Sequence, residues 1–172
     1  MKNRFVFSVL AFLILAVPAI SQEFSYVGAP KCQICHKTEK QGQQYVIWEA
    51  SKHSKSFAAL TCPEAAEVAK AMGVEKPADD ARCLKCHSPL AAKAAELKPE
   101  GVSCEVCHGP GSEYKKLTVM KDKAASVKSG LVLYGSPDAI KTRCMGCHET
   151  PHGKKFDFDS YWEKIKHPVP GK

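Results

Sequence analysis

The stretch CEVCH at residues 104–108 sets the pattern that decides this fold, because its Cys-x-x-Cys-His spacing occurs four times in the chain. The other copies begin at Cys32, Cys83 and Cys144. Eight of the nine cysteines in the 172 residues belong to these copies, so the cysteine content does not indicate a plain disulfide scaffold. The ninth, Cys62, is expected to be a small buried residue beside a helix start.

Each copy of the motif fits the covalent attachment of a c-type haem. Two cysteines on one tight turn can reach both vinyl groups of a porphyrin edge, and the histidine that follows offers its imidazole to the iron. Zinc sites also pair Cys-x-x-Cys motifs, but they have no reason to place a histidine after every second cysteine. We therefore predict four covalent haem c groups, each with its iron, as the cofactors. The predicted attachment residues are Cys32, Cys35, His36, Cys83, Cys86, His87, Cys104, Cys107, His108, Cys144, Cys147 and His148.

Residues 1–21 have the pattern of a cleaved secretory signal peptide. A short basic start precedes an apolar stretch at residues 5–17, and small residues then precede a cut before Gln22. A membrane anchor is the alternative, but the stretch is shorter than the ~20 residues that a spanning helix needs. We predict a single mature domain over residues 22–172, located in the periplasm or secreted beyond it, with no stable membrane span after cleavage.

The composition is that of a folded domain, with 44% hydrophobic and 25% charged residues, which excludes a disordered or membrane-embedded chain. The formal net charge is +7 with histidine neutral. The propionates of four haems would offset much of that charge, so it is a poor argument for binding nucleic acid or a membrane surface. We expect redox partner proteins, and no nucleic acid, as partners.

The segments between the motifs are predicted to be mainly helical. An apolar stripe of 3.6-residue period predicts a long helix over residues 39–60, and residues 131–134 are the only strand-like run. Because so small a chain must hold four haems, the porphyrins are expected to supply much of the core. We predict a mainly α fold with little regular sheet, compactly wrapped around four covalent haems. Shorter helices are expected at residues 61–71, 88–98, 113–129 and 157–166.

Axial ligands are in short supply for four irons. Only His53, His152 and His167 lie outside the motifs, and methionine is the other common axial ligand of cytochromes c. At least one iron therefore has methionine, an open position or a ligand from another chain. His53 and His167 are favoured as ligands, whereas His152 is equally compatible with a surface position. Met120 is compatible with ligation or packing, and Met72 is most simply a core residue.

Four stretches carry a family resemblance, and they are distributed so that the resemblance covers nearly all of the mature chain. GVSCEVCHGPG is the more specific part, whereas the bare motifs are not specific. The stretches are YVGAPKCQICHK at 26–37, SKHSKSFAAL at 51–60, GVSCEVCHGPGSEY at 101–114 and KFDFDSYWEKIKH at 155–167. They resemble the cytochrome c-554 family of tetrahaem electron carriers.

That resemblance implies axial partners for three of the irons. It implies His53 opposite His108, and His167 opposite His36. It also implies an open axial position on the iron of His87.

The chain departs from the family pattern at the fourth haem. The family ligand there is a histidine shortly after the GPG segment, but this sequence has no histidine between His108 and His148. Met120 falls near that place, so we favour a His148–Met120 pair, with His152 or an intermolecular ligand as the alternatives. The predicted iron ligands are His36, His87, His108, His148, His53, His167 and Met120.

Taken together, the sequence predicts a periplasmic electron-transfer protein that passes electrons between redox partners through four haems. No general acid–base or nucleophilic constellation occurs, so we predict no catalytic residue and no enzyme activity. One alternative is a small haem enzyme acting on a nitrogen oxide, hydroxylamine or peroxide at an open second iron. Another is a subunit of a conductive cytochrome filament.

Overall fold

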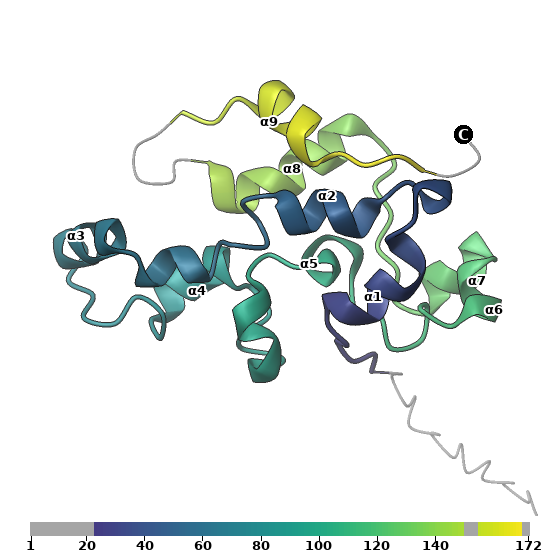
Figure 1. Ribbon diagram of the computed structural model, residues 1–172, viewed down its shortest axis with the longest axis horizontal. Helices are drawn as coiled ribbons and strands as arrows, with labels where there is room; N and C mark the ends of the chain where they lie inside the picture. Colours follow the sequence, from purple (N-terminus) through teal and green to yellow (C-terminus); the bar gives the residue numbers. More distant parts are fainter. Residues whose placement is uncertain (1–22, 150–154, 170–172) are drawn as a thin grey trace, which may run out of the picture.

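The computed structural model describes residues 23–149 and 155–169 (Figure 1). Within these residues all regular structure is helical and no strand occurs, so the predicted mainly α fold is confirmed. The strand-like run at 131–134 is not paired into a sheet. The predicted signal peptide and His152 lie outside the described residues.

Each Cys-x-x-Cys-His motif forms the last turn of a helix, and its histidine is the last helical residue. The motif helices are α1 (Ala29–His36), α4 (Ala81–His87), α5 (Cys104–His108) and α8 (Pro137–His148). The other α-helices are α2 (Gln44–Ala50), α3 (Pro63–Ala71), α6 (Leu117–Met120), α7 (Lys123–Lys128) and α9 (Phe158–Ile165). Short 3-10 helices are η1 (Glu39–Gln41), η2 (Ala58–Thr61) and η3 (Ala95–Glu100). None of the helices in the described part of the chain has the length and apolar character to span a membrane.

The long helix predicted over residues 39–60 is wrong, because the chain breaks after α2. Three serine hydroxyls in the following turns donate to backbone carbonyls three to five residues earlier. Such hydroxyls compete with the helical hydrogen-bond ladder and favour turns. The apolar period therefore continues across a bend instead of along one axis. The serines are Ser51, Ser54 and Ser56.

Two of the shorter predicted helices are confirmed, residues 61–71 as α3 and residues 157–166 as α9. The helix predicted at 113–129 is divided between α6 and α7. The division occurs because the Asp122 carboxylate accepts an amide hydrogen and so begins a new helix. The helix predicted at 88–98 is wrong, since turns and η3 occupy that segment.

The polypeptide alone builds only a small apolar core. The largest fully buried side chains are polar, namely Glu105, Ser88 and Ser126. Large apolar residues normally fill the interior of a domain. A chain that packs around large apolar cofactors has less need of them, as the sequence predicts. The buried apolar residues are Ala29, Tyr45, Leu60, Ala69, Val74, Leu90, Ala94 and Tyr114.

Candidate functional site

The thiols of different motifs meet in a fixed order. The thiols of Cys32 on α1 and Cys104 on α5 are neighbours, and their interaction lowers the pKa of Cys32 and raises that of Cys104. On α8, the pKa of Cys147 is raised to about 11, first by burial and then by the neighbouring Cys86 of α4. Cys107 of α5 also raises the pKa of Cys147. The motif helices therefore follow one another in the order α1, α5, α8, α4.

Two histidines outside the motifs lie beside motif histidines. The ring centroids of His53 and His148 are 6.1 Å apart with the planes tilted by 50°. Those of His108 and His167 are 5.9 Å apart, with a tilt of 41°. A metal–imidazole bond of about 2.0 Å and about 1.1 Å more to the ring centre place two trans imidazoles about 6 Å apart. Both pairs therefore have the spacing of two axial ligands with one iron between them.

These are not the pairs that the family resemblance implies. The resemblance implies His53 opposite His108, but His53 lies beside His148. It implies His167 opposite His36, but His167 lies beside His108. His53 lies in the turns that follow α2, and its ring lies beside the last residue of α8.

The expected pairing of His148 with Met120 stays a prediction, but the ring that lies beside His148 in the structure is that of His53. Met120 ends α6, and α6 and α7 lie on the opposite side of the molecule from the C-terminal end of α8 (Figure 1). Met72, expected in the core, is 43% exposed at the end of α3.

The paired imidazoles are in surroundings that favour their neutral form. Burial lowers the pKa of His53, and the charge of His148 lowers it further. Burial, followed by His167 and His36, lowers the pKa of His108 to about 4. Burial also lowers the pKa of His148 and of His167. A neutral imidazole is the form that binds a metal, so these rings fit iron ligands.

One nitrogen in this set gives an independent test of the fit. His167 Nδ1 is buried and has no hydrogen-bond partner among residues 23–149 and 155–169. A buried polar atom in this position is costly unless another group binds it. The donor set of two cysteine sulfurs, a motif histidine and a neighbouring imidazole therefore fits a haem c at the third motif, and at the fourth motif the ring spacing of His53 and His148 supports the same fit.

The other two motif histidines are oriented by hydrogen bonds. His36 Nδ1 lies 3.2 Å from Gln44 Oε1, and His87 Nδ1 lies 2.8 Å from the carbonyl oxygen of Ser56. Hydrogen bonds to one ring nitrogen fix the orientation of a metal-binding histidine. They leave Nε2 of each ring for an iron. In the described part of the chain, no ring contact joins either of them to a second histidine.

Two carboxylates that sequence reasoning missed tie the first motif to the third. Glu105 lies between the cysteines of the third motif and is 1% exposed. Glu100 accepts the amide hydrogen of Ala29 at 2.9 Å, at the start of α1. A charged residue inside a motif is the only signal for Glu105 in the sequence. The Glu105 carboxylate accepts amide hydrogens at 2.6–3.1 Å from Val27, Gly28 and Gly111.

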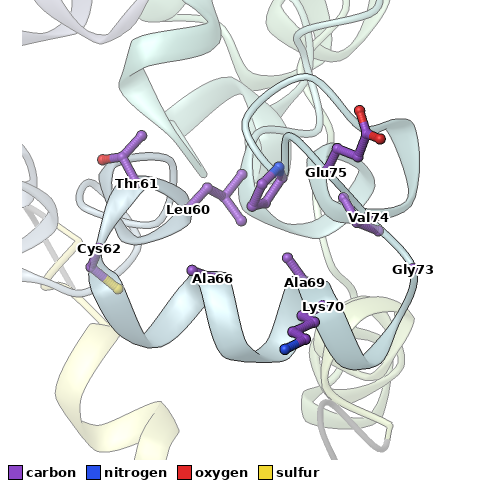
Figure 2. A pocket seen from close by; sticks show the side chains of 10 residues that line it. Leu60, Thr61, Cys62, Ala66, Ala69, Lys70, Gly73, Val74 and Glu75 are labelled. Carbon is purple, nitrogen blue, oxygen red and sulfur yellow. The ribbon is translucent and has the colours of Figure 1, made fainter.

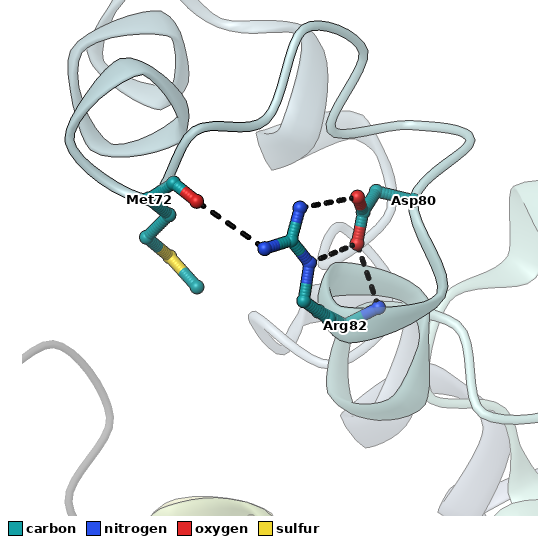
Figure 3. Close-up of polar contacts among 3 residues, drawn as sticks. All are labelled: Met72, Asp80 and Arg82. Atoms are coloured by element: carbon teal, nitrogen blue, oxygen red, sulfur yellow. Dashed lines mark hydrogen bonds and ion pairs between the residues drawn. The ribbon is translucent and has the colours of Figure 1, made fainter.

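The second motif is placed by a polar link between α3 and α4. Asp80 caps α4 by accepting the amide hydrogen of Arg82 at 2.8 Å, and the two side chains form an ion pair at 2.8 Å. Arg82 also donates to the carbonyl of Met72 at 3.2 Å (Figure 3). The link fixes where α4 begins.

A groove of 590 Å³ opens between η2, α3 and the loop that follows (Figure 2). Cys62 lies on its wall at the start of α3, where its thiol donates to the carbonyl of Ala59 at 3.1 Å. Cys62 is therefore beside a helix start, as expected, but it is only half-buried.

Comparisons with known proteins agree with the motifs. The model of a family described as cytochrome c554 and c-prime matches residues 31–109, which contain the first three motifs. The chain is also 26% identical to a cytochrome c-554 of Nitrosomonas europaea, over 91% of this chain and 69% of that protein. No solved structure shows a significant match. The family resemblance predicted from the sequence is confirmed.

Proposed function

We propose, on the basis of its relationship to the cytochrome c-554 family, that this chain is an electron-transfer protein with four covalent haem c groups. The observation that carries the proposal is that each of the four motifs ends a helix at its histidine, and that two of these histidines lie beside a further imidazole. Haem c supplies one-electron redox chemistry at its iron. The number of haems rests on the four motifs, and residues 22–172 are proposed to form one domain around them.

The chain's own residues bind and orient these groups. The cysteine pairs attach each porphyrin. His148 with His53, and His108 with His167, are the proposed axial pairs, because their rings face each other at 5.9–6.1 Å. The neutral, buried imidazoles of these two pairs would hold two of the irons in a defined environment, and burial of this kind would tune their reduction potentials.

The order of the motifs supports a path for electrons. The pKa values of Cys32 and Cys147 respond to cysteines of neighbouring motifs, so porphyrins attached to these cysteines would come close together. Electrons would then pass between the first, third, fourth and second haems. Redox partner proteins would exchange electrons with the first and second haems, at the two ends of the order. The predicted signal peptide supports a periplasmic location for this exchange.

The axial ligands opposite His36 and His87 are a separate part of the proposal. Met120 stays a proposed ligand, now for an iron other than that of His148. A thioether ligand gives ferric haem a weak charge-transfer band at the red end of the spectrum. Met120→Ala should remove such a band and lower the highest potential, whereas an unchanged spectrum and potential would exclude Met120 as a ligand.

Intact-mass measurement of the mature protein tests the number of haems. The polypeptide from about Gln22 should carry four haem masses that resist acid–acetone extraction. Cys62→Ala is the matched control, because Cys62 belongs to no motif, and it should also retain four haems. Three or fewer haems in mature protein, or a loss in the Cys62 variant, would contradict the proposal.

A further inference from the structure

Three aromatic rings form a stack that begins at a motif histidine. The Phe156 ring lies 4.3 Å from the His148 ring, centroid to centroid, with the planes at 17°. On α9 the Tyr161 ring continues the stack at 5.3 Å from Phe156 and 18°. Lys164 Nζ lies 4.8 Å from the centroid of the Tyr161 ring. Phe156 is therefore held between the end of α8 and the middle of α9.

Phe156 and His53 contact the His148 ring in different ways. The His53 ring lies 6.1 Å away and is tilted by 50°, a spacing that fits a second ligand of the same iron. Phe156 is nearly parallel to His148 and close to it. Turning the imidazole about a bond to iron would break this parallel contact, which aromatic pairs favour beyond their buried area.

His148 is thus oriented by a different means from His36 and His87. Those two rings are held by hydrogen bonds at Nδ1, to Gln44 and Ser56. Hydrogen bonds of this kind are the usual way in which a protein fixes a ligating imidazole. At His148 a stacked ring is available for the same task.

We propose that Phe156 is a positioning residue that sets the plane of the His148 imidazole, and so the angle between the His148 and His53 rings on their shared iron. The inference rests on the proposed function, because it requires His148 to bind iron. The angle between two axial imidazole planes governs the splitting of the iron d orbitals. It therefore governs the g values of a low-spin ferric haem in electron paramagnetic resonance.

The test compares the spectra of fully oxidised variants that carry the same number of haems by mass. Phe156→Leu removes the ring and should shift the g values of one low-spin signal. Phe156→Tyr keeps the ring and should have the g values of the wild type. Phe158→Leu is the matched control, since Phe158 stacks on Trp162 instead of on a motif histidine. Unchanged g values in Phe156→Leu, or an equal shift in Phe158→Leu, would overturn the inference.

Tyr161→Leu protects the test against poor maturation of the Phe156 variant. Tyr161 is 50% exposed, so its replacement is tolerable, and losing the outer ring should shift the same signal by a smaller amount. If Phe156→Leu does not mature, an unchanged Tyr161→Leu spectrum overturns the inference.

His53→Ala, measured in the same series, tests the proposed axial pair by itself. If it leaves every low-spin signal in place, the pair fails. In that case the g values of Phe156→Leu and Phe156→Tyr, compared with the wild type, still decide whether the stack positions His148.

Discussion

The junction between α1 and α5 and the junction between α8 and α9 each hold a motif, but by different forces. At the first, the buried Glu105 carboxylate accepts backbone amide hydrogens from both sides of the junction. At the second, Phe156 stacks between His148 and Tyr161, and Tyr161 is half exposed. Directional bonds to the backbone fix where two helices lie. A ring stack fixes how one side chain is turned.

The difference suggests a division of tasks between the two junctions. The α1–α5 junction sets the spacing of the first and third motifs, so substitutions there should lower the free energy of unfolding. The α8–α9 junction is proposed to set the geometry at one iron, so substitutions there should change the spectrum and the reduction potential of that haem. Changes at the first junction should therefore have the larger effect on unfolding.

Removing the buried carboxylate should have the largest effect. Glu105→Ala leaves three amide groups without their acceptor, and each buried unsatisfied group costs about 1–3 kcal/mol. We expect the free energy of unfolding to fall by about 3–5 kcal/mol, measured by guanidinium denaturation.

Glu113→Ala is the control for this experiment. Glu113 forms an ion pair of 2.6 Å with Lys116 at the surface, and such pairs contribute about 0.2–1 kcal/mol. Equal losses in the Glu105 and Glu113 variants would show that the buried carboxylate is not what holds the junction.

Replacing a glycine at the same junction should have the next largest effect on the free energy of unfolding. Gly28 has φ of +84°, and an added Cβ would lie 2.6 Å from Glu100 Oε1 and 3.0 Å from Leu97 Cδ2. Gly28→Ala should destabilise the protein by about 2–3 kcal/mol through backbone strain and crowding. Unfolding curves of Gly28→Ala and Gly73→Ala measure the difference.

Gly73 separates the two contributions. It also has a positive φ, +64°, but nothing lies within 4 Å of an added Cβ. Gly73→Ala should therefore cost only about 1–2 kcal/mol, from backbone strain alone. A Gly73 variant as unstable as the Gly28 variant would remove the case for crowding at the junction.

The smallest effect is a pH dependence at Glu100. Burial raises its pKa above 4.5 and the charge of Glu105 raises it further, while the hydrogen bond from Ala29 opposes the rise. The folded protein then binds this proton more tightly than the unfolded chain does. The stability that this tighter proton binding contributes is fully present below pH 4.5. It is lost as the pH rises through the raised pKa of the folded protein.

Glu100→Gln keeps an oxygen for the Ala29 amide but cannot titrate. The fall in stability with rising pH should therefore be shallower in this variant, measured by denaturation at a series of pH values above 4.5. The exposed Glu96, replaced by Gln, serves as the control and should follow the wild type. Parallel curves for the wild type and Glu100→Gln would contradict the expected contribution.

How far the sequence predicts this structure depends on whether a feature is local. The motifs, the helices α3 and α9 and the helical class follow from local patterns of spacing and capping. The break after α2 was missed because the apolar period masked the competing hydroxyls of Ser51 and its neighbours. The start of α7 at Asp122 was missed for a similar reason, a capping side chain inside an otherwise helical segment.

Local sequence patterns do not predict the two pairs of histidine rings. His53 and His148 are 95 residues apart in sequence, yet their ring centroids lie 6.1 Å apart. The role of Glu105 depends on backbone amides of Val27 and Gly28, 78 and 77 residues away. Such contacts are set by tertiary packing, which spacing within a motif does not report.

The most direct test of the account is electron paramagnetic resonance of the oxidised protein beside His53→Ala and His167→Ala. If His53 faces His148 and His167 faces His108 across separate irons, each variant converts one low-spin signal to high spin, and the two signals differ. An unchanged spectrum in either variant, or loss of the same signal in both, would contradict the arrangement of haems described here.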